Sequence, residues 1–167
     1  KRNEIEVIRY RHYRQHDVYF AFDDASQGRL RYREDDFLDE KNNTVSTRAR
    51  LTLIGVKREE KLAHDVLLSR SRFLAPAMQS LRFYREYFKP KMETEIEKDR
   101  LRWLVHYKDT EFFINLDHVI YPQAENFLEI KSRTWSRKDA EHKTELVNEL
   151  LDLLGLTDAK TVTQDYI

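Results

Sequence analysis

Basic residues recur at every second position in several stretches of the sequence. The clearest stretch is Thr94–Tyr107, TEIEKDRLRWLVHY, which holds Lys98, Arg100 and Arg102. Successive side chains of a β-strand point to opposite faces, so these three cations would share one face while apolar residues fill the other. Guanidinium groups donate two parallel hydrogen bonds to phosphate oxygens, and an ammonium group adds a compact charge. The spacing predicts a phosphate-binding strand face, although a solvated strand shows the same alternation.

The same alternation of charged and apolar residues recurs in other segments, and the repetition favours the binding interpretation. The further basic positions are Arg31 and Arg33 in GRLRYRE, Arg48 and Arg50 in STRARLTLIG, and Lys131 in FLEIKSRTW. Two carboxylates, Asp117 in EFFINLDHVI and Glu129 in FLEIKSRTW, lie on faces of the same kind. Carboxylates are unusual in a simple phosphate site, but their oxygens suit a divalent cation.

Six segments have the composition or the alternation of strands, and two have the pattern of helices. The predicted strands are 7–22, 28–34, 46–55, 94–107, 111–120 and 127–135. The acidic segment Asp35–Asn43 is predicted to be an exposed loop. One helix is expected over Ala77–Phe88. A second begins at Ser136, which forms a variant capping box with Asp139, and ends at Gly155.

These elements predict an α+β fold that is mainly antiparallel β. The apolar strand faces must be buried, and the two helices are natural covers for them. The charged faces then line either bulk water or the inside of a closed or nearly closed β-barrel with the helices packed on its outside. Burying so many like charges costs several kcal/mol each unless a polyanion neutralises them. A barrel of this kind implies a phosphate-rich ligand.

The composition argues against several classes of function. The length is that of one domain, so we treat 1–167 as a single domain. Lys and Arg number 30 and so do Asp and Glu, which does not favour a nucleic-acid partner because such proteins are usually basic. There is no cysteine, which excludes disulfides and thiolate sites. We find no run of about 18 apolar residues and no signal peptide, so we expect a cytoplasmic protein without a membrane segment.

Five short motifs occur in the order seen in a known family. They are QHDVYF at 15–20, GRLRYRE at 28–34, EKDRLRW at 97–103, NLDHV at 115–119 and FLEIK at 127–131. In these motifs the chain resembles the CYTH domain, or triphosphate tunnel metalloenzymes, which include class IV adenylyl cyclases, thiamine triphosphatases and inorganic triphosphatases. The resemblance implies a closed antiparallel barrel whose basic tunnel acts on triphosphates with Mg²⁺ or Mn²⁺.

The resemblance also implies roles for individual residues. The substrate-binding set is Arg31, Arg33, Arg48, Arg50, Lys98, Arg100, Arg102 and Lys131. The implied metal ligands are Asp117 and Glu129. The implied catalytic residues are Lys98, Arg100 and Glu129. The leading hypothesis is metal-dependent hydrolysis of a triphosphate compound. The alternatives are a non-catalytic domain that binds polyphosphate or nucleotide, cyclisation of ATP, and a purely structural β-domain.

Two positions depart from the family pattern. The family's N-terminal strand reads Glu-x-Glu-x-Lys, whereas this chain has Glu4 and Glu6 followed by Ile8. We therefore expect the signature strand to precede Lys1, in a longer protein with possible fused or partner domains. Lys131 stands where many members have a second glutamate, which removes a metal ligand and adds a phosphate contact. The residues say nothing about the oligomeric state.

Overall fold

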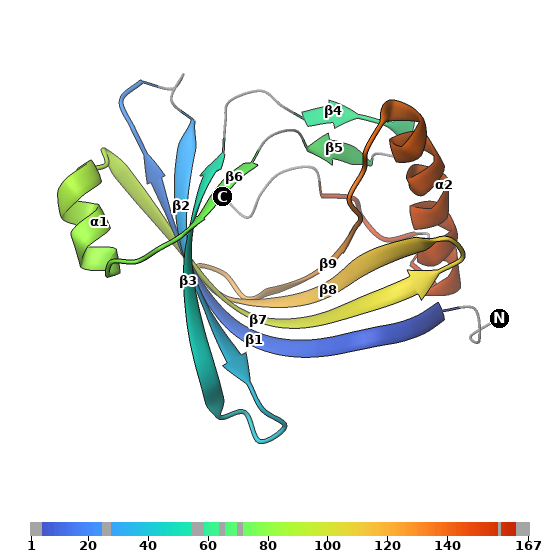
Figure 1. Cartoon of the computed structure of the whole chain (residues 1–167), viewed down its shortest axis with the longest axis horizontal. Coiled ribbons are helices and arrows are strands. Elements are labelled where there is room, and N and C mark those ends of the chain that lie inside the picture. Colours follow the sequence, from blue (N-terminus) through green and yellow to red (C-terminus); the bar gives the residue numbers. More distant parts are fainter. Residues whose placement is uncertain are drawn as a thin grey trace.

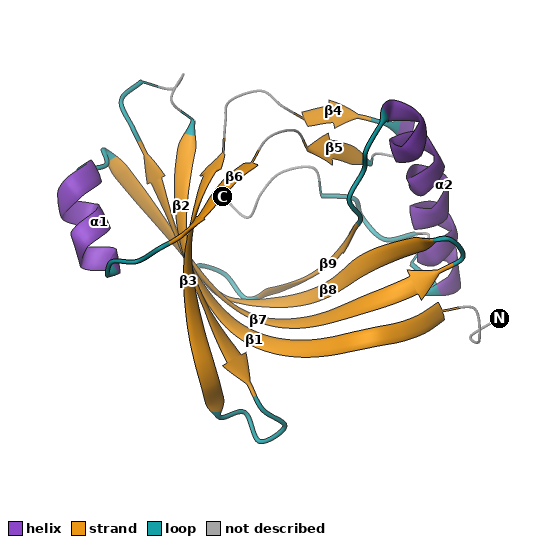
Figure 2. Ribbon diagram, in the orientation of Figure 1, coloured by secondary structure: helices purple, strands orange, loops and turns teal. Residues whose placement is uncertain are grey.

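The computed structural model describes residues 5–24, 28–54, 59–63, 66–69, 72–156 and 158–162. Figure 1 shows a strongly curved sheet with one helix near each end, and Figure 2 shows the predominance of strands. The first six strands are β1 (Ile5–Ala21), β2 (Arg29–Leu38), β3 (Thr44–Ile54), β4 (Glu59–Lys61), β5 (Leu67–Ser69) and β6 (Arg72–Pro76). They are followed by α1 (Leu81–Phe88), β7 (Met92–Tyr107), β8 (Thr110–Tyr121), β9 (Glu125–Lys131) and α2 (Arg137–Leu153).

Seven strands form one sheet in the order β6-β3-β2-β1-β7-β8-β9, and β4 pairs with β5 in a separate ribbon. Every pairing is antiparallel. The predicted α+β class with mainly antiparallel strands is therefore confirmed. Within the described part of the chain no ladder joins β6 to β9, so the sheet is open and the expected closed barrel is not confirmed.

Both helices pack on one face of the sheet and leave the other face to charged residues. Tyr84 of α1 packs against Phe20 and Tyr32. At the far end, Leu146 and Leu150 of α2 pack in the same cluster as Val105 and Phe112 of the sheet. The alternate strand positions point the other way, and we call this second face the charged face. Its central residues, all buried, are Gln15, Asp17, Arg33, Asp35, Lys98, Arg100, Asn115 and Asp117.

A small apolar cluster closes one end of the charged face. It consists of Tyr19, Ile96 and Val119, with Ile54 and Phe127 packed against them. Ile54 belongs to β3 and Phe127 to β9, so strands from near the two ends of the sheet order meet here. The curvature of the sheet is therefore set partly by apolar contacts on its concave side.

The first strand extends well beyond its partner on one side. β2 pairs with β1 from His12 to Ala21, whereas β7 also pairs with the earlier residues of β1. The segment from Ile5 to Arg11 thus has no described neighbour on the β2 side, and its residues from Glu6 to Tyr10 are exposed. Arg9 and Arg11 lie on this overhanging segment.

The element predictions were mostly confirmed, with three corrections. The strand predicted over 127–135 ends at Lys131. The loop predicted over Asp35–Asn43 is wrong in its first half, because β2 continues to Leu38 and Asp35 is fully buried among arginines. The first helix begins only at Leu81, where the Ser80 hydroxyl accepts a hydrogen bond from the Phe83 amide. The segment QDYI at 164–167, for which the sequence predicts an extended conformation, lies outside the described residues.

The second helix has the predicted boundaries. The Ser136 hydroxyl accepts a hydrogen bond from the Asp139 amide at 3.1 Å, and Gly155 follows the helix with a φ of 73°. A left-handed residue at this position favours glycine. Within the described residues, neither helix is long and apolar enough to cross a membrane.

Candidate functional site

One buried ion pair on the charged face joins β1 to β2. Asp17 is fully buried and accepts hydrogen bonds from Arg33 Nε and Nη2, both at 2.5 Å. Burial alone would raise the pKa of Asp17, but the Arg33 guanidinium more than offsets this and the pKa falls to about 2. Arg33, predicted to bind substrate, is therefore already neutralised by a protein carboxylate.

A second buried ion pair joins β7 to β8. Arg100 and Asp117 form a two-point contact, and the Lys98 ammonium lies 3.3 Å from the Asp117 carboxylate. Lys98 also lies 3.8 Å from Asp17, so it stands between the two ion pairs. Burial, helped by the nearby Arg100 and Arg33 charges, lowers the pKa of Lys98 to about 7.

Glu129 on β9 ends this network. One Glu129 oxygen lies 3.4 Å from Arg100 Nη2, and Lys131 contacts both Glu129 oxygens at 3.0 Å. The amide nitrogen of Asn115 donates to Glu129 at 2.6 Å. Burial would raise the pKa of Glu129, but Lys131 and Arg100 outweigh it and hold the pKa well below its usual range. The pKa of Lys131 falls to about 8, chiefly because of burial.

The two predicted metal ligands are thus both held by cations. Asp117 and Glu129 lie on adjacent strands and share Arg100 as a partner. Within the described ranges, no group of three or more Asp, Glu or His side chains is placed to hold a metal ion. In this arrangement the two carboxylates serve as counter-ions to the basic residues.

Asp35 of β2 is also a buried counter-ion for arginines, on the side of β1 opposite to β7. It accepts hydrogen bonds from Gln15 at 2.5 Å, from Arg50 at 2.5 Å and from Arg48 at 3.0 Å. Burial would raise the pKa of Asp35, but Arg50 and Arg33 outweigh it and the pKa is lowered. Asp35 was not among the predicted site residues, because a pair of acidic residues is typical of a loop. Its place in strict alternation after Arg31 and Arg33 was the available signal.

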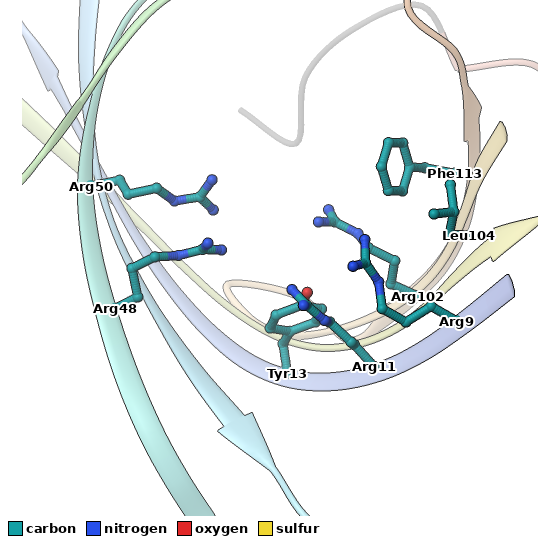
Figure 3. A pocket seen from close by; sticks show the side chains of 8 residues that line it. All are labelled: Arg9, Arg11, Tyr13, Arg48, Arg50, Arg102, Leu104 and Phe113. Carbon is teal, nitrogen blue, oxygen red and sulfur yellow. The ribbon is translucent and has the colours of Figure 1, made fainter. Parts of the chain in front are cut away.

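Arginines converge around an open pocket next to this network, which we call the arginine pocket. Its volume is about 180 Å³, and it is lined by Arg9, Arg11, Tyr13, Arg48, Arg50, Arg102, Leu104 and Phe113. Figure 3 shows Arg48 and Arg50 pointing from β3 across the cavity toward Arg9, Arg11 and Arg102 on the opposite wall. No carboxylate is among the lining residues.

Five of the predicted substrate-binding residues lie outside the arginine pocket and three line it. Arg33, Lys98, Arg100 and Lys131 are held in ion pairs, and Arg31 contacts Thr52 at 3.4 Å. Arg48, Arg50 and Arg102 line the pocket. Arg9 and Arg11 were not among the predicted site residues, although their alternation in VIRYRHYR was a usable signal. The structure places them opposite β3 because β1 overhangs β2 and the sheet curves.

Together, the fold and the site describe a curved antiparallel sheet with a basic, ion-paired concave face. Two solved structures share this fold. The PH1819 protein from Pyrococcus horikoshii OT3 is 20% identical, with a TM-score of 0.67 over 99% of this chain and 86% of that chain. The conserved hypothetical protein Pfu-838710-001 from Pyrococcus furiosus is 18% identical, with a TM-score of 0.57 over 97% of this chain and 84% of that chain.

At such identities the likeness concerns the fold alone. No protein-family model matches the chain, and no curated protein matches it in sequence.

Proposed function

We propose that this chain binds a phosphate-rich anion, a triphosphate or polyphosphate compound, in the arginine pocket. The observation that carries the proposal is the convergence of five guanidinium groups on one cavity whose lining includes no carboxylate. Arginine forks bind phosphate oxygens in pairs, and several forks around one cavity suit an anion with several phosphoryl groups.

The electrostatics of the pocket support the same ligand. Burial and neighbouring cations lower the pKa of Arg50 and Arg102, although both remain protonated because arginine pKa values are so high. Holding like charges together in a partly buried cavity is unfavourable, and a bound polyanion offsets that repulsion. Asp35 neutralises part of the charge of Arg48 and Arg50, but Arg9, Arg11 and Arg102 form no ion pair with any described carboxylate.

Metal-dependent hydrolysis of the bound triphosphate is the second candidate function. The observation that favours it is that Asp117 and Glu129 share one partner, Arg100. Asp117 and Glu129 would be the residues to hold Mg²⁺ or Mn²⁺, whose charge would stabilise the phosphoryl oxygens. Closure of the curved sheet into a tunnel around the anion, as the CYTH resemblance implies, belongs to this candidate.

The test is calorimetric titration of the chain with tripolyphosphate, repeated with Mg²⁺, Mn²⁺ or EDTA. We expect binding by the wild-type chain and strong weakening by the paired change Arg11→Glu with Arg48→Glu. Arg14→Glu is the matched control, because Arg14 is exposed on the opposite face of β1. Absence of binding in the wild type, or equal weakening by the control, would overturn the proposal.

A further inference from the structure

Asn115 connects the arginine pocket to the buried ion pairs. It is fully buried and lies directly opposite Arg102 on β7 and Glu129 on β9. Its amide oxygen accepts a hydrogen bond from Arg102 Nε at 2.7 Å, and its amide nitrogen donates to Glu129 at 2.6 Å. An arginine can only donate and an ionised carboxylate can only accept, so the two partners fix which way the amide points.

Arg102 is held on its other sides by aromatic rings. Its guanidinium carbon lies 5.3 Å from the centroid of Tyr13 and 5.6 Å from the centroid of Phe113. Guanidinium groups are attracted to aromatic faces at this range. The hydrogen bond at Nε and the two rings together restrict the rotation of the side chain, so the orientation of its fork is fixed before any ligand arrives.

The terminal nitrogens of Arg102 have a different status from those of Arg48 and Arg50. Arg48 and Arg50 each direct Nη2 to Asp35. The described residues provide Arg102 with no hydrogen-bond acceptor beyond Asn115. Arg102 therefore lines the pocket with a guanidinium group of fixed orientation. No described carboxylate accepts a hydrogen bond from its terminal nitrogens.

We propose that Asn115 is a positioning residue that holds Arg102 as the two-point phosphate donor of the arginine pocket. This inference rests on the proposed anion binding and names the side chain that forms the oriented hydrogen bonds to a phosphoryl group. Two parallel hydrogen bonds require the plane of the fork to match the oxygens of the anion. A fork oriented in advance loses less conformational freedom on binding than the exposed side chain of Arg9. The other arginines contribute positive charge, and Arg102 contributes a guanidinium group that is already oriented for two parallel hydrogen bonds.

The alternative is that Asn115 merely ties three strands together. A double-mutant cycle with tripolyphosphate titrations on the full chain separates the two roles. Arg102→Lys keeps the charge but removes the fork, and we expect it to weaken binding about tenfold, or about 1.4 kcal/mol. Arg11→Lys is the matched control and should weaken binding much less. Asn115→Ala should weaken binding to a similar extent as Arg102→Lys, and the double variant should bind no more weakly than Arg102→Lys alone.

The outcomes distinguish this inference from the proposed function. If the wild type does not bind tripolyphosphate, the proposed function fails. If the wild type binds but Arg102→Lys equals Arg11→Lys, or if the effects of Asn115→Ala and Arg102→Lys add, anion binding stands and the positioning role is overturned. A thermal unfolding midpoint reports whether Asn115→Ala folds. If it does not, Asn115→Ser, which keeps one hydroxyl acceptor, replaces it in the same cycle.

Discussion

Arg33 and Asp17 lie directly opposite each other on neighbouring strands and form a two-point ion pair, although neither is more than 6% exposed. A charge pair in such a place is stable only while both partners are present, because either one alone would be an uncompensated buried charge. The charged face is therefore as much a part of the folded core as the apolar clusters beneath the helices.

Replacing Asp17 should destabilise the fold strongly. Asp17→Asn leaves Arg33 without its counter-ion, and we expect a loss of about 3–5 kcal/mol in the free energy of unfolding at neutral pH. The pKa of Asp17 falls from 3.8 to about 2 on folding, so its contribution is present above about pH 4 and is lost as the pH falls toward 2. Urea titrations should show the difference between wild type and variant shrinking over that range. Asp99→Asn, a change on the opposite face, should cost about 1 kcal/mol or less.

Lys98 should make stability rise with pH on the alkaline side of neutrality. Its pKa is about 7 in the folded chain and 10.5 in the unfolded chain, so between these values the unfolded chain binds more protons. The free energy of unfolding then increases by up to about 1.4 kcal/mol per pH unit. Lys98→Met removes this proton linkage. Denaturant titrations between pH 7 and pH 9 measure this linkage as the free energy of unfolding of the wild type minus that of the variant. A difference that does not change with pH would contradict the lowered pKa of Lys98.

Removing the Asp35 carboxylate should lower the stability of the fold and raise its affinity for the anion. Asp35→Asn frees Arg48 and Arg50 from their counter-ion, so tripolyphosphate should bind severalfold more tightly while the thermal midpoint falls. Asp36→Asn is the matched control, because Asp36 is on the other face of β2, where it accepts a hydrogen bond from the Thr47 hydroxyl. Unchanged affinity in Asp35→Asn would show that the anion does not contact these arginines.

The apolar contacts of α2 should support folding without affecting the site. Leu150→Ala removes a fully buried side chain from the cluster beneath the helix and should cost about 2–5 kcal/mol. The affinity for tripolyphosphate of the folded fraction should not change, because α2 packs on the opposite face. Leu154→Ala, at an exposed position on the same segment, should have little effect on either quantity.

The second candidate function predicts phosphate release that depends on Mg²⁺ or Mn²⁺ and stops with EDTA. Glu129→Gln should abolish this release while Glu125→Gln, at an exposed position on the same strand, should not. A colorimetric phosphate assay measures both. Tight tripolyphosphate binding with no release in any of these cations would leave the binding function and exclude hydrolysis.

Alternation in the sequence was enough to predict the strands of the main sheet that carry the charged face. It also placed Arg33, Lys98, Arg100 and Asp117 on strand faces that proved to be the same face of the sheet. It did not predict which of those charges would be buried as pairs, because each pair joins different strands and depends on register. The partners of Asp35, for example, come from β1 and β3.

The arginine pocket was harder to predict for a related reason. Arg9 and Arg48 lie far apart in the sequence and on strands that are not neighbours in the sheet. Only the curvature of the sheet and the overhang of β1 bring them to one cavity. Local patterns carry no information about either property.

The paired charges also determine how the strands align. If β1 slipped by one residue against β2, Val18 would enter the ion-paired network and Asp17 would be driven under α1, because neighbouring residues exchange faces. Apolar packing alone disfavours such a slip because contacts are lost. Here the slip would also place the Asp17 carboxylate in an apolar layer and leave Arg33 without its counter-ion. The salt bridges of the charged face thus specify the register of the hairpin, because a shifted pairing would leave buried charges unpaired as the sheet assembles.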